Sequence, residues 1–277
     1  MVEKQTKSSY FTTWNPVDRF KQVPEVIIHN NHSDLSGLNR NSIKILSWNI
    51  AKNNYKPSWS KDFFSLIEQY QPDKIFLQEV LLRADVAEIP ELAQMTWAFT
   101  PNFIDTFDNT YSGILIATKG NPISSKALVT KHCEPVSNTP KVSLFAEYSL
   151  DDCYENLLAV NTHLINFVNL SKFKAQIQEI ESIVATHQGA IILAGDFNTW
   201  NKSRWRMLYK MTARLNLTPV SFTAEDTKKI KSFLLSPPLD YIFYRGSVQK
   251  PHTAKVIDNI SSSDHNPLFA ELCLKNN

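Results

Sequence analysis

The residues best suited to chemistry are polar side chains at the ends of short apolar runs. They are carboxylates, amides and an imidazole, placed in runs typical of β-strands. The positions are Asn49, Glu79, His163, Asp196, Asn198 and Asp240. If these strand ends meet at one edge of a sheet, they would form a cleft able to bind a hard cation and a phosphate.

A further acid and a histidine are adjacent near the end of the sequence, in SSSDHNPL at 261–268. Adjacent side chains of an extended chain point to opposite sides, so Asp264 and His265 could not face one layer in a regular strand. One interpretation is an exposed loop without a function. The other is that each side chain serves a different part of one site.

Each of these residues, taken alone, has a structural explanation. An asparagine at a strand end is commonly a turn former, Glu79 beside Gln78 could be a solvated charge, and His163 could be a hydrogen-bonded core histidine. Five polar strand ends together favour a shared site. Neither of the glycine-rich phosphate loops, GxxxxGK[ST] or GxGxxG, occurs in the sequence.

The elements that must position these residues are short strands separated by a few helices. We expect strands over 43–50, 74–80, 111–118, 141–150, 157–164, 190–198 and 239–244. A helix capped by Ser60 would place Phe63, Phe64, Ile67 and Tyr70 on one face and stop before Pro72. A second, capped by Ser171 and closed by Gly189, would bury Phe173, Ile177, Ile180 and Val184. A third is expected over roughly 202–215.

Composition favours one soluble globular domain. The 277 residues are 43% hydrophobic and 20% charged, and the 14 prolines and 6 glycines are scattered rather than gathered in a linker. We therefore expect a single α/β domain over 43–277, with many strands and few helices. Residues 1–42 are polar and lack clear periodicity, which indicates an extension or a packed arm.

Charge is distributed unevenly along the chain. The net charge is +2, yet residues 202–231 hold eight Lys or Arg and two acids. Lys202, Arg206 and Lys210 have helical spacing and follow Trp200, which favours contact with a nucleic-acid backbone and bases. The alternative is a solvated helix face.

Nothing in the sequence indicates a membrane span or a Sec signal peptide. The three cysteines have no CxxC spacing, so neither a disulfide framework nor a zinc site follows. The expectation is a cytoplasmic monomer with no stable membrane insertion. Delivery by a secretion system that needs no N-terminal signal stays open.

Seven strings, in order from 43 to 272, resemble the endonuclease/exonuclease/phosphatase superfamily of metal-dependent phosphoesterases. They are SWNI, LQEV, YSGILIAT near Gly113, NTHL, AGDFNTW, LDYIFYRG and SDHNPL. NTHLINF, GDFNTW, LDYIFYRG and SDHNPL resemble in particular the bacterial YafD-like branch. The resemblance implies a four-layer α/β sandwich, in which two mostly antiparallel β-sheets pack face to face between helices.

The resemblance also implies a metal site. Glu79 is similar to the principal carboxylate ligand for Mg²⁺, with Asn49 beside it and Asp264 at the second acidic position. Mn²⁺ is expected to substitute. A hard cation that keeps several waters is typically held by few oxygen ligands.

The remaining site residues receive catalytic roles from the same resemblance. His265 is similar to the base that deprotonates the attacking water, and Asp240 to the carboxylate that orients its imidazole. Asp196 and Asn198 match the pair that positions the nucleophile and contacts the phosphate. His163 matches a histidine that stabilises the phosphoryl oxygens or assists the leaving group.

Departures from the family patterns narrow the expected function. Ala51 stands where abasic-site endonucleases usually carry an acid, and His163 where they place a tyrosine. PPLDYIF lacks the signature of inositol polyphosphate 5-phosphatases. We expect a phosphodiesterase, with nucleic acid as the substrate. The first alternative is a phospholipid, phosphoinositide or sphingomyelin phosphodiesterase, with 97–107 as an apolar membrane loop. The second is a catalytically inactive binding protein.

Overall fold

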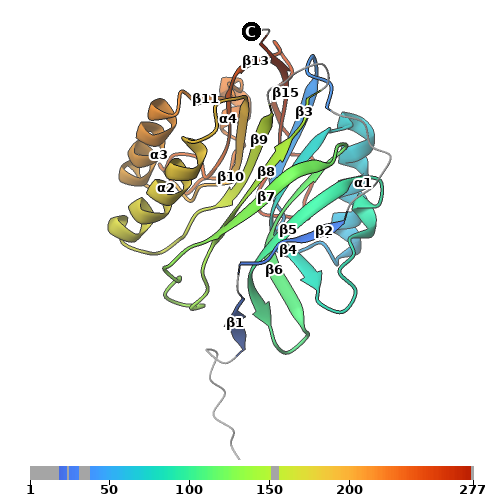
Figure 1. Ribbon diagram of the computed structural model, residues 1–277, viewed down its shortest axis with the longest axis vertical. Coiled ribbons are helices and arrows are strands. Elements are labelled where there is room, and N and C mark those ends of the chain that lie inside the picture. The colour runs from blue at the N-terminus through green and yellow to red at the C-terminus, as the bar shows by residue number, and fades with distance from the viewer. Residues whose placement is uncertain (1–18, 24, 31–37, 151–155, 276–277) are drawn as a thin grey trace, which may run out of the picture.

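The computed structural model describes residues 19–23, 25–30, 38–150 and 156–275. Two β-sheets face each other in this part of the chain, and helices cover their outer faces (Figure 1). The strands are β1 (Phe20–Gln22), β2 (Ile28–Asn30), β3 (Ile43–Asn49), β4 (Lys74–Arg83), β5 (Thr96–Asp105), β6 (Thr110–Thr118), β7 (Pro122–Val129), β8 (Val142–Tyr148), β9 (Leu157–His163), β10 (Ile191–Asp196), β11 (Thr218–Pro219), β12 (Asp240–Arg245), β13 (Ser247–Gln249), β14 (Lys255–Val256) and β15 (Leu268–Leu274). The helices are α1 (Pro57–Tyr70), η2 (Pro90–Leu92), α2 (Leu170–Val184), α3 (Lys202–Arg214) and α4 (Ala224–Thr227).

The two sheets are mixed but mostly antiparallel. The first has the strand order β1-β5-β6-β4-β3-β15-β13, with β2 on β5 and β14 on β15. The second has the order β11-β12-β10-β9-β8-β7. The parallel pairs are β3 with β4 and β9 with β10. Each is joined through a helix, α1 or α2, as parallel neighbours require.

Three apolar clusters hold the layers together. The first lies between the sheets and includes Ile45, Phe76 and Ile192. A second joins α1 to the outer face of the first sheet through Trp59 and Phe63. The third joins α2 and α3 to the second sheet. The arrangement is the four-layer α/β sandwich expected from the sequence (Figure 1).

The predicted strands are confirmed, and the helices differ mainly at their ends. α1 begins at Pro57, one turn before the predicted cap, and Ser60 Oγ instead donates a hydrogen bond to Glu91. A proline at the first helical position fits because its missing N–H would have no partner there. Phe64 is 54% exposed rather than on the buried face.

The predicted boundaries of α2 were wrong at both ends. Its N-cap is Asn169, whose side chain accepts from the Lys172 N–H, while Ser171 lies inside the helix. The helix ends at Val184, before Gly189 is reached. Its predicted apolar face is confirmed, because Phe173, Ile177, Ile180 and Val184 are all buried. The third helix, α3, matches its predicted range.

Two other expectations change with the structure. Residues 97–107, considered as an exposed membrane loop, belong largely to the buried strand β5, so that prediction was wrong. Within the expected arm at 1–42, β1 and β2 extend the first sheet by pairing with β5. For the part of 1–42 that lies outside the described residues, the extension or packed arm stays a prediction. Among the described residues, no helix is long and apolar enough to cross a membrane.

Gly113 lies opposite two irregularities of the first sheet. The β4–β6 ladder shifts register at Glu79, and the β5–β6 ladder shifts at Asn102, so Gly113 faces both bulges. A Cβ at Gly113 would lie 2.2 Å from the Thr100 carbonyl oxygen. Only glycine therefore lets these three strands approach so closely.

We predict that Gly113→Ala lowers the free energy of unfolding by about 1–3 kcal/mol, because the added methyl group overpacks the backbone of β5. Urea denaturation of the metal-free protein measures the change. Ser124→Ala on the exposed edge strand β7 is the matched control and should leave stability nearly unchanged. Equal unfolding free energies for the two variants would contradict the close-approach argument.

Candidate active site

A cleft of about 410 Å³ lies where strand ends of the two sheets meet. Asn49, His163 and Asp196 are the last residues of β3, β9 and β10. The predicted residues that line the cleft are Asn49, Glu79, His163, Asp196, Asn198, Asp264 and His265. The last predicted member, Asp240, does not line the cleft itself but contacts His265, which does. The structure thus brings the eight residues together, while their catalytic roles stay predictions.

Asp196 is the centre of the buried hydrogen-bond network. One carboxylate oxygen accepts from the Asn49 side-chain amide at 3.1 Å and lies 3.5 Å from His163 Nε2. The other accepts from the Asn198 backbone N–H at 2.9 Å. Asn198 takes a left-handed backbone, with φ of 47°, and its side chain donates to the Leu164 carbonyl. Asn198, the second residue after Asp196, therefore turns back so that its backbone N–H binds the Asp196 carboxylate.

His265 and Asp240 form a buried dyad. His265 Nδ1 lies 2.8 Å from an Asp240 carboxylate oxygen. A neutral imidazole that donates from Nδ1 keeps Nε2 as its acceptor, and this is the arrangement a general base requires. Asp240 begins β12 and pairs with Asp196 of β10 in the ladder, so one strand pair supplies both carboxylates.

The two halves of this network shift each other's pKa. Burial raises the pKa of Asp196 to about 7, and the negative charge of Asp240 adds to the rise. Burial alone would lower the pKa of His265, but the charge and hydrogen bond of Asp240 outweigh it and raise the pKa to about 9. The two carboxylates thus favour a positive charge between them, and His265 supplies it as an imidazolium.

Glu79 reaches the cleft because its strand is interrupted. It is the unpaired residue of the β4 bulge and has a left-handed φ of 55°. A glutamate in that conformation is strained, and bulges commonly redirect a side chain toward a site. Its nearest cation is Lys52, with Nζ 3.7 Å from Oε2.

Asp264 has a more exposed place than its neighbour. Its carboxylate lines the cleft mouth, is 63% exposed and accepts from Lys231 Nζ at 3.0 Å. The preceding serines fix the loop, since Ser263 Oγ donates to the Asn49 carbonyl and accepts from the His265 N–H. Trp48 Nε1 donates to the His265 carbonyl. The adjacent side chains therefore do serve different parts of one cleft.

His163 is a neutral histidine between cations. Burial, followed by the positive charges of Lys141, His265 and Lys52, lowers its pKa well below the ordinary value. A neutral imidazole at this position can donate a hydrogen bond to an oxygen in the cleft without bringing a full charge.

The donor set of the cleft fits a hard divalent cation. Glu79, Asn49 and Asp264 offer oxygen atoms, and the buried Asp196 carboxylate has no fixed cation of its own apart from His265. Among the described residues, one group of ligand-type atoms lies within 4.8 Å of one another, from Asp196, Asp240 and His265. Because His265 Nδ1 already bonds Asp240, Asp196 is the member of that group most available to a metal.

Several cleft residues had no individual sequence signal. Glu134, Lys141, Asn166 and Phe167 also line it, and none of them was singled out from the sequence. Beneath the cleft, Asn161 joins the two sheets. Its amide donates to the Leu77 and Leu115 carbonyls, and its carbonyl oxygen accepts from Gln78 Nε2. NTHL and LQEV could have indicated this bridge, because both place a polar side chain inside an apolar run.

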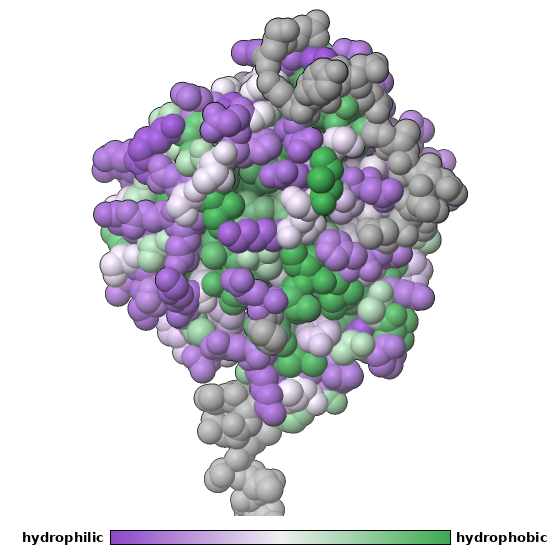
Figure 2. All heavy atoms as spheres, viewed as in Figure 1, coloured by the Kyte–Doolittle hydropathy of each residue, from purple (hydrophilic) through white to green (hydrophobic). Residues whose placement is uncertain are grey.

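The three predicted substrate-binding cations on α3 do not line the cleft. Lys202, Arg206 and Lys210 are exposed on α3, where Figure 2 shows a mostly hydrophilic surface over α2 and α3. Trp200 donates from Nε1 to Asn166 Oδ1 at 2.8 Å, so it supports a cleft loop. Arg204 is fully buried and donates to the Ile165 and Val168 carbonyls. One of the eight cations counted in the sequence, Arg204, is therefore structural.

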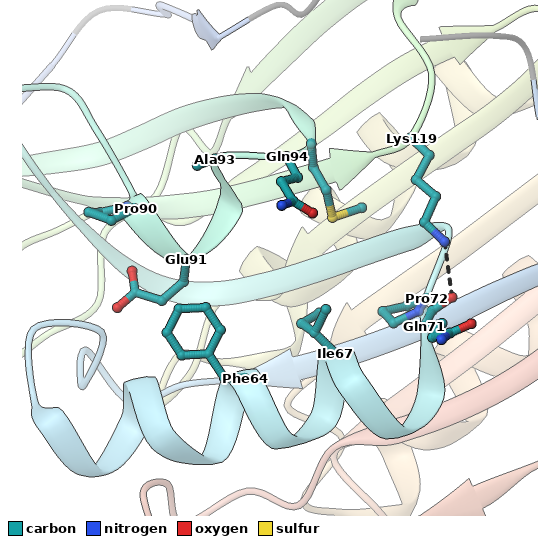
Figure 3. A pocket seen from close by; sticks show the side chains of 10 residues that line it. Phe64, Ile67, Gln71, Pro72, Pro90, Glu91, Ala93, Gln94 and Lys119 are labelled. Atoms are coloured by element: carbon teal, nitrogen blue, oxygen red, sulfur yellow. Dashed lines mark hydrogen bonds between the residues drawn. The ribbon is translucent and has the colours of Figure 1, made fainter.

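A second hollow, of about 400 Å³, lies between α1 and the segment around η2 (Figure 3). Phe64, Ile67 and Met95 give it apolar walls, and Lys119 donates to the Gln71 carbonyl at its edge. It holds none of the predicted site residues. The polar cleft is therefore the candidate active site.

We predict that one imidazole of the protein titrates near pH 9 and that Asp240→Asn lowers its pKa, because burial is then opposed only by the charges of Asp196 and Asp264. NMR of the histidine Cε1–H signals, assigned with His265→Asn, measures this. A raised pKa stabilises the fold at low pH, so this contribution is lost as the pH rises from about 6.5 through about 9. Lys202→Gln is the control and should leave the titration unchanged. A His265 pKa near 6.5 in both proteins would contradict the dyad.

The chain matches known proteins along most of its length. The model of the Endonuclease/Exonuclease/phosphatase family matches residues 46–265. A UPF0294 protein from Vibrio campbellii is 32% identical over 237 residues, which are 84% of this chain and 78% of that protein. Another, from Photorhabdus laumondii, is 31% identical over 229 residues, covering 82% of each chain.

Solved structures share the fold. The catalytic domain of human Nocturnin, solved with bound sulfate, aligns with a TM-score of 0.64 and 18% identity over 87% of this chain and 97% of that one. ANGEL2, described as a 2′,3′-cyclic phosphatase, aligns with a TM-score of 0.62 and 16% identity over 92% and 99%. Together with the family match and the relatives, these findings confirm that the chain belongs to the endonuclease/exonuclease/phosphatase family.

Proposed function

We propose that the chain is a metal-dependent phosphodiester hydrolase in which His265 activates water. The observation that carries the proposal is the His265–Asp240 dyad, at 2.8 Å, opening on a cleft that also holds Asp196 and Glu79. Members of this family are in general hydrolases of phosphoester bonds, so the dyad and the carboxylates have a coherent use.

The side chains have separate tasks in this proposal. Asp240 holds the imidazole so that Nε2 faces the cleft, and Nε2 takes a proton from the attacking water. Asn198 and Asp196 position the water and the phosphate, while neutral His163 donates to a phosphoryl oxygen. Lys141 lines the same cleft and adds positive charge for the phosphate.

Glu79, Asn49, Asp196 and Asp264 would hold the cation. Mg²⁺, with Mn²⁺ as a substitute, would neutralise charge that develops on the phosphoryl oxygens and would lower the pKa of the neighbouring imidazolium. The carboxyl-rich, oxygen-only donor set is the one that hard cations prefer.

Nucleic acid is the first proposed substrate. The bonds cleaved would be the phosphodiester bonds in the backbone of DNA or RNA. The exposed cations Lys202, Arg206 and Lys210 support this proposal, because they lie on α3, directly after the Asp196–Asn198 strand end. Phe167 and Phe233 at the cleft could stack on unpaired bases.

A phospholipid headgroup is the second proposed substrate, and one observation favours it. Loops at the cleft carry the exposed apolar side chains of Phe167, Phe233, Leu234 and Leu235, whereas the basic strip on α3 lies outside the cleft lining. A surface of this kind suits the edge of a lipid layer.

We predict that His265→Asn lowers the hydrolysis rate about 10²- to 10⁴-fold, because the general base is lost while the buried shape is nearly kept. Supercoiled DNA, single-stranded DNA, RNA, sphingomyelin and phosphoinositide vesicles are each incubated with wild type and variant in Mg²⁺ or Mn²⁺. The substrate cleaved by wild type alone identifies the class.

The control is His252→Asn, an exposed histidine outside the cleft lining, which should match wild type. Wild type that cleaves none of these substrates would sink the hydrolase proposal and favour an inactive binding protein. A fully active His265→Asn would contradict the assigned base.

A further inference from the structure

The mouth of the cleft carries apolar side chains that the hydrolysis of a phosphodiester does not require. Leu234 and Leu235 are each 93% exposed, and Phe167 is 66% exposed. Lys231, Phe233 and Phe167 line the cleft itself, so the loops that bear these side chains form its walls. Val136, 91% exposed, lies two residues from Glu134, another residue of the lining.

The leucines are held at the tip of a tight turn. The Ser236 N–H donates to the Phe233 carbonyl at 2.9 Å, and the Phe233 N–H donates to Ser236 Oγ at 2.8 Å. Pro237 and Pro238 follow and stiffen the exit of the turn. The tip is thus a defined structure that presents two aliphatic side chains to the outside.

Two of the exposed apolar residues have strained backbones. Leu235 has φ of 60° and Phe167 has φ of 51°, in the region where glycine or asparagine is usual. A leucine at the third position of such a turn costs conformational energy and gains no burial. Retaining it makes sense if a partner outside the chain covers it.

The loop that bears Val136 and the loop that bears Phe167 are hydrogen-bonded to each other. The Asn166 N–H donates to Glu134 Oε1 at 2.9 Å, and the Asn166 side chain is held by Trp200. The loop that bears Leu234 and Leu235 is tied to the SSSDHNPL segment. Lys231 pairs with Asp264, and Asn266 Nδ2 donates to the Lys229 carbonyl. The apolar tips therefore surround the mouth as fixed projections rather than as one groove.

We propose that these tips dock the cleft mouth on the surface of a phospholipid bilayer, an inference that rests on the phosphodiester hydrolase proposed above. A bilayer accepts apolar tips from separate loops at once and offers phosphodiesters to a cleft between them. Leu234 and Leu235 enter the acyl boundary, while the exposed Lys228, just before the same loop, meets anionic headgroups. Aliphatic tips would gain little from bases, which stack on aromatic rings.

Co-sedimentation of the full chain with phosphatidylcholine vesicles, with and without phosphatidylglycerol, tests this docking. We expect wild type to bind, more strongly with phosphatidylglycerol, and the double variant L234S/L235S to bind at least tenfold more weakly. The matched control is I123S/V248S, which removes two exposed apolar side chains outside the mouth, 57% and 52% exposed in the wild type. It should bind as wild type does, and melting temperatures show that both variants fold.

Three results would overturn the docking proposal. They are a wild type that binds neither vesicle, a control that loses as much binding as L234S/L235S, and a leucine variant that loses affinity for a single-stranded oligonucleotide but not for vesicles. Wild-type hydrolysis of bis(p-nitrophenyl) phosphate in solution is measured beside them. Vesicle binding without that hydrolysis would refute the hydrolase proposal and leave the docking intact.

Discussion

The buried carboxylate of Asp196 is the constraint on which the rest of the site depends. A charged carboxylate out of water costs several kcal/mol unless hydrogen bonds and opposite charge offset the loss of hydration. Its partners here are Asn49 from β3, His163 from β9 and the Asn198 backbone after β10, with His265 close by. The two sheets must therefore pack in one relative position, or the carboxylate loses its partners.

The same constraint links the fold to the proposed chemistry. Two aspartates and one histidine share a small buried volume, so the histidine holds its proton tightly when no other cation is near. A divalent cation among the oxygen donors would supply that charge instead and would free the imidazole to act as a base. In this proposal, binding of the cation is what lowers the pKa of His265 and so activates it as a base. The Gln78–Asn161 bridge beneath keeps the halves of the site in register.

The strands, and the polar residues that gather at the cleft, could be predicted because both leave local patterns, while the roles of those residues stay predictions. Apolar runs identify the strands, and strand-end polar residues such as Asp196 and Glu79 stand out within them. Helix starts were harder, since Asn169 and Ser171 are both residue types that cap helices well, and the folded chain uses Asn169. The bulge that turns Glu79 into the cleft depends on Gly113 and β5, which are distant in sequence.

The surroundings of the site could not be predicted from charge or composition. Arg204 counted as a basic residue in the sequence, yet it is buried and bonds to carbonyl oxygens of the loop after β9. Leu234 and Leu235 had no signal of function, since only the folded loops show that they stand exposed beside the cleft. The lipid proposal therefore rests on these exposed leucines, because residues 97–107, which suggested it in the sequence, lie largely in β5.

Calorimetric titration of the metal-free protein with Mg²⁺ and Mn²⁺ tests the central claim most directly. The account predicts saturable binding by wild type and binding at least about tenfold weaker by Glu79→Gln and Asp196→Asn, because each removes a charged oxygen ligand. Lys202→Gln, outside the cleft, should bind as wild type does. A wild type that binds neither ion, or carboxylate variants that bind them equally well, would contradict the account.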